Sequence, residues 1–555
     1  MVGVSEVTEH DLPVGADDQD DAPVELRRSS PDREDHAESM VASEGRAARL
    51  LALPRRMTPP QWLMVVLVVL YVAYFTKRSL DLHHGLATAS YDSALYDQGV
   101  WLLSRFEAPF VTLMGRNLFG DHTSFVMLFL VPVYWVFPAA GTMFFAQAAA
   151  IGAGAIPVFL YGRNRLGSEW FALVAGAGYL LHPAVGWTNL ENFHPDSFLG
   201  VFVGFAIYGA LERRWRLYAV FVVLSLLVKE DASLVVVPLG IWVALRRDRR
   251  IGLLTVVGSA AFMLVAMFVV MRTLIGVPTR NTWRIPFGGP GGLVDTAITN
   301  PSELAEHLRS DGRPWYLWQM TAPFAWLFLR APSVALISGL VLVTNVLSTF
   351  WYQYQIEYHY SLVAVPALAL GTVYAIGAVR DRVHLRVNDD DGRPRLVEVP
   401  LRGLLVTALG CAALVGAILW APVPFGRTPL YYGDPDSPAA VAARELIDEI
   451  PSDASVAAHY RLTPHLAHRT EIYQFPTPFR VELYGPDDSY GGKRLGRRSE
   501  GVDYVLLPVS RDARLNADWA VIEPAFDVVD ENDYWILYER DRRVELPPGG
   551  ADIEP

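Results

Sequence analysis

Apolar runs separated by short charged clusters extend from residue 61 to residue 421. A helix needs about 20 apolar residues to cross a bilayer, and runs of this kind are typical of a polytopic membrane protein. We predict about eleven crossings, several of them short and therefore tilted or extended into flanking residues. The predicted spans are 61–76, 141–161, 169–185, 197–211, 216–229, 232–246, 251–273, 314–329, 333–349, 361–380 and 402–421.

One further apolar run does not fit a crossing. The run from Ser124 to Phe137 has about 14 residues, fewer than the roughly 20 that a span needs, and it contains Pro132. We predict a re-entrant or interfacial helix here. Leaving this run out of the crossings also keeps the basic clusters on one side of the membrane.

Basic residues between the runs set the orientation. Arg46, Arg49, Arg55 and Arg56 precede the first apolar run, and lysine and arginine gather at the cytoplasmic ends of spans. The N-terminus is therefore predicted to be cytoplasmic, and the first loop, from Tyr91 to His122, to lie outside. The later basic clusters then fall on the cytoplasmic side: Arg163 with Arg165, 212–216, 246–250 and 380–395.

Composition divides the chain into three regions. Residues 1–56 are rich in Asp, Glu, Ser and Pro and low in aromatics, so we predict a disordered cytoplasmic tail. Residues 57–423 form the predicted transmembrane domain. Residues 424–555 combine an amphipathic helical pattern, AAVAARELIDEI, with the strand-like runs SVAAHY, EIYQF, DYVLLPV and DYWILYE. They predict a small extracytoplasmic α/β domain.

The overall composition supports a cell-membrane protein and excludes some partners. The 555 residues are 52% hydrophobic and 19% charged, with a mean hydropathy of +0.23, whereas soluble proteins are about a quarter charged. The net charge of −12 arises largely at the two ends of the chain. The sequence has no basic stripe with interleaved aromatics, which excludes nucleic acid as a partner. The single cysteine excludes a disulfide within the chain.

Polar clusters between the runs gather on the predicted outer side. A charge near the membrane core costs several kcal/mol, so such clusters are candidates for a functional site. The candidate catalytic residues are Asp92 and Asp97, in the first loop. The candidate substrate-binding residues are Asp121, His122, Glu191, His194, Asp196, Lys229, Glu230, Asp231, Arg280, Arg284, Glu357 and His359.

Asp92 and Asp97 are not expected to share a face. Five residues on a helix turn the chain through about 500°, which leaves the two side chains about 140° apart. We expect Asp92 to point into a cleft while Asp97 caps a helix or faces water. The alternative is that both lie on the solvated face of an interfacial helix whose apolar side holds Leu95, Trp101 and Leu102.

Two of these clusters also fit a metal ion. Asp121 with His122, and His194 with Asp196, combine histidine with carboxylate, which suits a divalent cation. The spacings match no closed zinc motif. The alternative is hydrogen bonding at a helix start, in which Asp196, followed by Ser197, caps the next span. A divalent metal ion therefore stays one of two interpretations.

The cations in these clusters have two interpretations as well. Arg280, Arg284 and Lys229 could bind a lipid phosphate, or the arginines could anchor the chain at the membrane interface. For Lys229, Glu230 and Asp231 the alternative to a site is a tight polar turn in which lysine neutralises a carboxylate. The C-terminal histidines, His459, His465 and His468, are expected to be surface or packing residues rather than ligands.

Several strings of the chain resemble one membrane-protein family. They are YDSALYDQGVW, LFGDHTS, YGRNRLG, LENFHPDS, ERRWRL and LLVKEDASL, and in this order and spacing they resemble the multi-pass proteins of domain of unknown function 2079. The resemblance covers roughly residues 80 to 380 and continues weakly through IPSDASVAAHYRLTPHLAHRTEIYQF. The family's architecture is similar to that of the GT-C glycosyltransferases.

The resemblance implies a fold and a function. The fold would be an α-helical polytopic GT-C-like domain followed by the α/β domain. The function would be transfer of a sugar from a polyprenyl-phosphate-linked donor to a glycan or protein acceptor of the cell envelope, on the outer side. In such enzymes an acid of the first outer loop is the general base, which here falls on Asp92, with Asp97 second. Better-characterised members carry an Asp-Glu pair where this chain has Asp92-Ser93. The alternative function is a non-catalytic transporter or scaffold for lipid or cell-envelope polymer.

Overall fold

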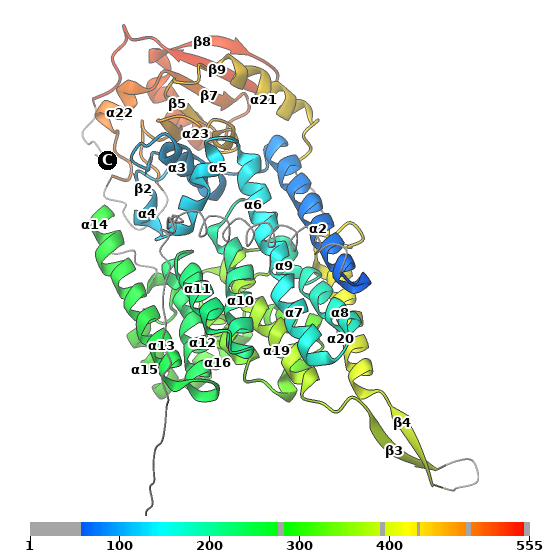
Figure 1. The fold of residues 1–555 in the computed structure, drawn as a ribbon. Helices are drawn as coiled ribbons and strands as arrows, with labels where there is room; N and C mark the ends of the chain where they lie inside the picture. The colour runs from blue at the N-terminus through cyan, green and yellow to red at the C-terminus, as the bar shows by residue number, and fades with distance from the viewer. Residues whose placement is uncertain (1–56, 276–281, 389–393, 430–432, 484–489, 549–555) are drawn as a thin grey trace, which may run out of the picture. The chain divides into compact units, whose positions relative to one another are not determined.

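The computed structural model describes residues 57–275, 282–388, 394–429, 433–483 and 490–548. The chain divides into two compact units, Met1–Thr58 and Pro59–Pro555. The described helices and strands all belong to the second unit (Figure 1). The predicted cytoplasmic tail, residues 1–56, lies outside the described residues.

Long apolar helices form the frame of this unit. Within the described residues, five continuous helical segments are long and apolar enough to cross a membrane. They are α2 (Pro59–His84), α6 (Ala140–Ala153) with α7 (Ala155–Leu166), α13 (Arg249–Val265) with η6 (Ala266–Met271) and α14 (Arg272–Ile275), η12 (His359–Ala364) with α19 (Val365–Gly377), and α20 (Leu401–Trp420). Each lies over a predicted span, so the mostly helical membrane fold is confirmed.

Shorter helices occupy most of the remaining predicted spans. They are α8 (Glu169–Leu180) with α9 (Pro183–Trp187), η4 (Pro195–Phe198) with α10 (Leu199–Leu211), α11 (Trp215–Leu226), α12 (Ser233–Arg246), and η10 (Ala335–Ser338) with α18 (Gly339–Leu347). Close backbone approach holds neighbours together. A methyl group on Gly252 of α13 would lie 2.2 Å from the backbone nitrogen of Ala244 in α12. Small residues at such crossings let the backbones of two helices pack directly.

The predicted span 314–329 differs from expectation because it is not one helix. It divides into α17 (Arg313–Thr321), η8 (Ala322–Phe324) and η9 (Leu327–Arg330). Ala325 and Trp326 have left-handed backbones, with φ of 50° and 52°, which an L-residue adopts only at a cost and which end a helix. Pro323 adds a second interruption because it lacks a backbone donor. The number of crossings therefore stays a prediction.

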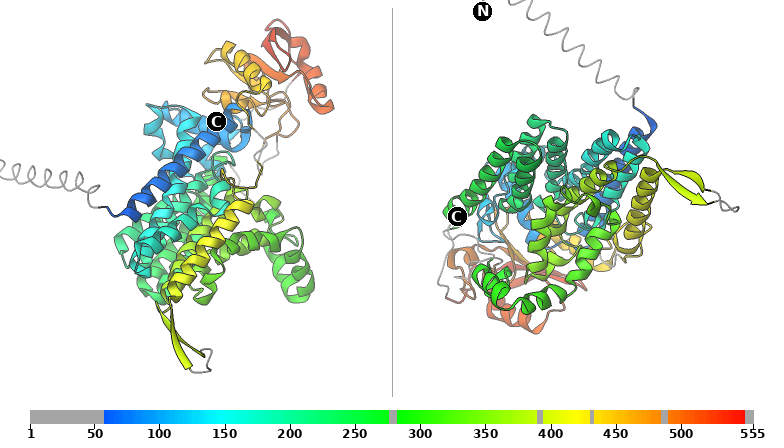
Figure 2. Two further views of the ribbon diagram at one scale, coloured as in Figure 1. Left: turned by 90° about the vertical axis from the view of Figure 1, so that its right-hand side faces the viewer. Right: turned by 90° about the horizontal axis from the view of Figure 1, so that it is seen from below.

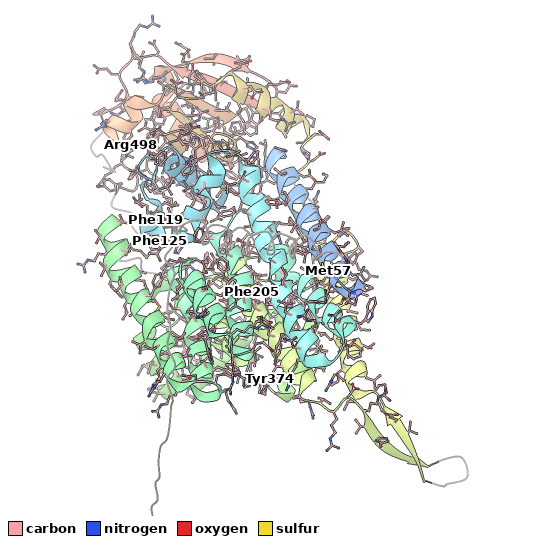
Figure 3. The ribbon with its side chains drawn as sticks, viewed as in Figure 1. Met57, Phe119, Phe125, Phe205, Tyr374 and Arg498 are labelled. Atoms are coloured by element: carbon pink, nitrogen blue, oxygen red, sulfur yellow. The ribbon has the colours of Figure 1, made fainter. Side chains whose placement is uncertain are left out.

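Basic residues lie at one end of the helices. Figure 3 labels Tyr374 at this end, near the foot of α19, and the guanidinium of Arg165 lies 5.7 Å from its ring centroid. Arg247, after α12, stacks in the same way on Trp242. The hairpin of β3 (Val383–Asn388) and β4 (Pro394–Val399) projects beyond the helices here (Figure 2). Part of the predicted basic segment 380–395 lies outside the described residues.

The first loop and the segment after it fold at the opposite end. Their elements are η2 (Ser90–Ala94), α3 (Leu95–Ser104), β1 (Phe110–Val111), β2 (Arg116–Asn117), α4 (Leu118–Asp121), η3 (Phe125–Phe129) and α5 (Val131–Tyr134). The run predicted to be re-entrant or interfacial thus forms two short helical turns. Phe129, Val136 and Phe137 remain more than half exposed, as expected of side chains that meet lipid.

Residues after α20 form the predicted α/β domain. Its sheet has the order β6-β5-β7-β9-β8, in which β5 is parallel to β6 and β7, and β9 is antiparallel to both its neighbours. The strands are β5 (Val456–Ala458), β6 (Ile472–Gln474), β7 (Tyr504–Pro508), β8 (Phe526–Glu531) and β9 (Trp535–Arg540), with helices α21 (Pro438–Glu449), α22 (Gly496–Gly501) and α23 (Ala513–Ile522). The sequence analysis missed β8, because five of its six residues are exposed and it lacks an alternating pattern.

The first loop packs directly against this sheet. The Thr112 hydroxyl donates to the carbonyl of Ile472 in β6 at 2.6 Å, and the buried Gln98 amide of α3 donates to the carbonyl of Thr470 at 3.1 Å. The Arg498 guanidinium, labelled in Figure 3, lies 4.7 Å from the centroid of the Phe110 ring. The loop therefore lies between the helices and the α/β domain. The domain boundary at residue 424 remains a prediction.

The remaining helices are short connections. They are α15 (Pro290–Thr299), α16 (Pro301–Arg309), and the single turns η5 (Glu230–Ala232), η7 (Thr282–Arg284), η11 (Trp351–Tyr354), η13 (Thr463–His465) and η14 (Glu523–Ala525). Two of these turns, η5 and η7, carry residues that the sequence analysis placed in the site.

Candidate functional site

A cavity of about 340 Å³ lies where the first loop meets the ends of the helices. One wall is polar and the other is apolar. The polar wall contains Asp92, Asp121, His122, His194, Lys229, Glu230, Asp231, Arg284 and His359. The apolar wall contains Leu234, Met263, Met267, Ile285, Pro286, Leu293 and Leu347. Nine of the sequence-predicted site residues, drawn from separate segments of the chain, thus line one hollow.

Asp92 is held on a strained backbone. Its φ and ψ are 74° and −79°, a conformation that costs a non-glycine residue about 1–3 kcal/mol and that clusters at functional sites. Asn192 holds the chain on both sides, because its side-chain oxygen accepts from the Ala89 amide and the Ser93 hydroxyl, each at 3.1 Å. The Asp92 side chain is 40% exposed and lines the cavity. The fold therefore constrains this carboxylate at the wall of a hollow.

Asp97 lies elsewhere. Its carboxylate is buried and accepts from the Tyr134 hydroxyl at 2.7 Å, and the His468 Nε2 lies 2.8 Å away. The expectation that Asp92 and Asp97 face different ways agrees with the structure, but the expectation that Asp97 caps a helix or faces water is wrong, because its carboxylate is buried and α3 has no side-chain cap. The alternative, in which both lie on a solvated face, is wrong because Asp97 is only 3% exposed. Its contacts connect α3 to the α/β domain.

The contact of Asp97 with His468 predicts a pH-dependent docking. Burial opposes the charged form of His468, but the Asp97 carboxylate outweighs burial and raises the pKa of His468 above its ordinary value. The contact therefore stabilises the fold fully below the ordinary histidine pKa of about 6.5, and this contribution is lost as pH rises through the raised pKa. Hydrogen exchange at α3 should be slower at pH 6 than at pH 9, after correction for intrinsic exchange rates. His468→Gln should flatten this difference, and a difference that survives the substitution would contradict the assignment.

Glu191, His194 and His359 form a buried cluster beside Asp92. The backbone amide of His359 donates to Glu191 Oε2 at 2.5 Å, and its Nδ1 lies 3.1 Å from the same oxygen. The rings of His194 and His359 stack with centroids 3.8 Å apart. His194 Nε2 lies 3.3 Å from Asp92 Oδ1. Burial raises the pKa of the Glu191 carboxyl to about 8. The cluster is thus compact, polar and poorly solvated.

Lys229 lies buried between two carboxylates. Its Nζ is 3.7 Å from Asp196 and 3.6 Å from Asp231, and the residue is 5% exposed. The alternative that Asp196 caps the next helix is wrong, because His194 holds the N-cap position of η4. Asp196 instead serves as a counter-charge for Lys229.

Glu230 orients His122 at the cavity wall. His122 Nδ1 lies 2.7 Å from Glu230 Oε1, and the Thr123 backbone amide donates to Oε2 at 3.2 Å. Burial alone would raise the pKa of Glu230, but His122 and Lys229 lower it to about 2. The adjacent Asp121 lies 3.4 Å from the guanidinium of Arg116. Phe119 and Phe125, labelled beside each other in Figure 3, flank this segment in the sequence and pack on each other with ring centroids 5.2 Å apart.

Arg284 lines the cavity, and its guanidinium packs against three aromatic rings. Its guanidinium lies 4.4 Å from the centroid of Phe350, 5.3 Å from that of Trp283 and 5.8 Å from that of Tyr360. Its buried Nε has no hydrogen-bond partner among the described residues. Arg280 lies outside the described residues, and Glu357 is half-buried beyond the cavity lining.

Comparison with known proteins places this arrangement in a family. The sequence matches the family described as "Predicted membrane protein (DUF2079)" over residues 82–544. The chain belongs to this family. No curated protein matches the sequence. Among solved structures, the fold of this DUF2079 protein is similar to the crystal structure of ArnT from Cupriavidus metallidurans in the apo state. The identity is 14% and the TM-score 0.50, covering 87% of this chain and 99% of that chain. This likeness shows the GT-C fold.

The DUF2079 site contains residues that the sequence analysis missed. Tyr96 and Tyr360 line the cavity, and Met263 and Met267 face it from α13 and η6. The two methionines are four residues apart, as side chains on one helix face must be. This spacing indicates that the two side chains share a helix face, but it does not show whether that face lines a cavity or meets lipid. Arg116, the partner of Asp121, lies within the first loop.

Proposed function

We propose that this DUF2079 protein transfers a sugar from a polyprenyl-phosphate-linked donor to an acceptor on the extracytoplasmic side. The observation that carries the proposal is the two-faced cavity, whose polar wall holds Asp92 and whose apolar wall belongs partly to a membrane-length helix. A lipid-linked sugar has the same two faces. Its phosphate and sugar need polar partners, while its hydrocarbon chain stays in the bilayer.

Asp92 is suited to act as general base. In the proposed step, an acceptor hydroxyl attacks the anomeric carbon and the bond from that carbon to the phosphate oxygen breaks. The Asp92 carboxylate takes the hydroxyl proton, and the polyprenyl phosphate leaves with the electron pair of the broken bond. Asp92 fits this role because it lines the cavity while its backbone is fixed by Asn192. The role rests on this geometry and on the resemblance to GT-C enzymes.

Arg284 is suited to hold the departing phosphate. Guanidinium groups bind phosphate through two parallel hydrogen bonds, and cationic groups near a leaving phosphate stabilise its developing charge. Arg284 is positioned by aromatic rings rather than by a carboxylate. Its donors therefore remain available to an anion. Lys229 is less suited to this role, because the carboxylates of Asp196 and Asp231 already offset its positive charge.

The proposed topology places this site outside the cell. The N-terminus is cytoplasmic, the basic ends of the helices face the cytoplasm, and the α/β domain is extracytoplasmic. The first loop and the α/β domain share hydrogen bonds, so they lie on one side of the membrane. The acceptor, a glycan or protein of the cell envelope, would approach from that side.

A transfer assay tests the proposal. The purified protein is incubated with radiolabelled polyprenyl-phosphate sugars and cell-envelope fractions, and both the labelled acceptor and the released polyprenyl phosphate are measured. Release that depends on acceptor is expected. Solute or lipid uptake into liposomes without sugar transfer would favour the transporter alternative. The absence of both transfer and uptake with every donor would favour a scaffold.

Replacing Arg284 should weaken donor binding. Arg284→Gln removes the positive charge and the bidentate hydrogen bonding of the guanidinium, so KM for the donor should rise at least tenfold. Arg284→Lys keeps the charge, so its KM should rise less. The measurement is initial rate against donor concentration. Arg427→Gln is the matched control, because Arg427 is an exposed arginine just after α20. An unchanged KM in Arg284→Gln would contradict the phosphate role.

A further inference from the structure

We propose that Glu191, His194 and His359 form a binding site for a divalent transition-metal ion beside Asp92, at the wall of the cavity. The inference goes beyond the proposed function, because it concerns the resting protein and holds whether or not the chain transfers sugar.

The three side chains converge from separate segments. Glu191 and His194 follow α9, and His359 begins η12 more than 160 residues later. Their donor atoms all lie within 4.8 Å of one another, and within the described part of the chain they are the only such group of three. Two imidazoles and a carboxylate suit zinc, manganese or iron rather than magnesium or calcium, which prefer oxygen ligands alone.

The hydrogen bonds of His194 leave one ring nitrogen available for a ligand bond. Its Nδ1 donates to the backbone carbonyl of Glu191 at 2.9 Å, which is the outer contact that holds a metal-ligating histidine and fixes its tautomer. The second ring nitrogen, Nε2, lies 3.3 Å from a carboxylate oxygen of Asp92. A proton on Nε2, or a cation between the two atoms, would satisfy this contact. The geometry thus calls for a positive centre at this point.

The charges around the cluster point the same way. The carboxylates of the polar wall and of the residues that contact it outnumber the permanent cations. The carboxylates are Asp92, Asp121, Glu191, Asp196, Glu230 and Asp231, and the cations are Arg116, Lys229 and Arg284. Buried charges in proteins are usually paired or coordinate metals. Arg116 pairs with Asp121, Lys229 lies between Asp196 and Asp231, and Glu230 contacts His122. Asp92 and Glu191 contact no lysine or arginine among the described residues.

The cluster must close slightly around an ion. Ligands of one tetrahedral zinc ion lie about 3.4 Å apart, given metal–ligand distances of about 2.1 Å, whereas the atoms here spread over as much as 4.8 Å. The stacked rings of His194 and His359, tilted by 23°, would rotate so that both present a nitrogen to the ion. Closure links the loop after α9 to the start of η12. Metal binding should therefore stabilise the protein against heat.

Metal content of the purified protein tests the proposal. Tag-free full-length protein in detergent is stripped with a chelator, dialysed against zinc, manganese or magnesium, and analysed by mass spectrometry of the metals. About one equivalent of zinc or manganese per chain is expected, with no retained magnesium, together with a rise in thermal midpoint. Less than a tenth of an equivalent of every transition metal would overturn the site.

Matched variants locate the ion. His194→Ala and Glu191→Gln should each lower zinc affinity at least tenfold, whereas His384→Ala, an exposed histidine of the β3–β4 hairpin, and Glu357→Gln should leave it unchanged. Should a ligand variant not fold, cobalt in the wild-type protein gives a second readout, because its visible spectrum reports nitrogen ligation and a low coordination number. A spectrum of aqueous cobalt, or equal binding by ligand and control variants, would overturn the proposal. Loss of transfer with full metal content would count against the proposed function alone.

Discussion

Asp92→Asn should lower the rate of sugar transfer by about 10²–10⁴-fold while leaving the fold intact, since a positioned general base contributes this much to a proton transfer. The substitution keeps size and shape, and the side chain is 40% exposed, so it places no new unpaired group in the core. The loss should appear in kcat more than in KM for the donor. Steady-state rates and circular dichroism of the same preparations provide the measurement.

Asp97→Asn is the informative partner of this variant. It is an acid of the same loop, but it accepts from Tyr134 and contacts His468 in a buried setting. Its loss should lower the thermal midpoint and loosen the α/β domain, with a smaller effect on the rate of the molecules that remain folded. Full activity in Asp92→Asn, or equal stability loss in both variants, would contradict the assignment of Asp92 as base.

Lys229→Met should destabilise the protein by about 3–5 kcal/mol, the usual result of removing one partner from a buried ion pair. The substitution leaves Asp196 and Asp231 close to each other without the ammonium group that lies 3.7 Å and 3.6 Å from them. Methionine preserves the length and apolar stem of lysine, so packing changes little. The thermal midpoint in detergent measures the effect.

A double substitution separates charge from shape. Lys229→Met combined with Asp196→Asn removes one buried charge of each sign and should recover part of the lost stability, because only Asp231 then lacks its cation and no second carboxylate repels it. Arg216→Met, an exposed cation near the opposite end of α11, should shift the midpoint little. Equal midpoints for the Lys229 single variant and the wild type would show that water already solvates this cluster.

The shared location of the site residues could be predicted from the sequence, but the contacts between individual side chains could not. Orientation follows from arginine positions, and orientation decides which loops can meet, so the convergence of Asp92, His194 and Glu230 could be predicted. The pairing of Asp97 with His468 could not, because 371 residues separate them and only the packed fold brings them together. The histidine was assigned to surface or packing for the same reason.

Local rules also reached their limit at the strained and irregular segments. Asp92 and Asp97 do face different ways, but helix geometry is not the cause, because Asp92 has a positive φ of 74° and lies at a kink before α3. Hydropathy predicted a single span over 314–329, but two consecutive residues with left-handed backbones interrupt the helix there. The edge strand β8 was missed because its exposed residues carry no alternation. Each failure lies where tertiary packing overrides local preference.

The attachment of α3 to the outer sheet has a consequence for how the protein could respond to its surroundings. Gln98 and Asp97 fasten one side of this short helix to the α/β domain, and Asp92 lies just before the helix, at the kink that precedes it. A displacement of the α/β domain would therefore be transmitted through α3 to the strained backbone that carries Asp92.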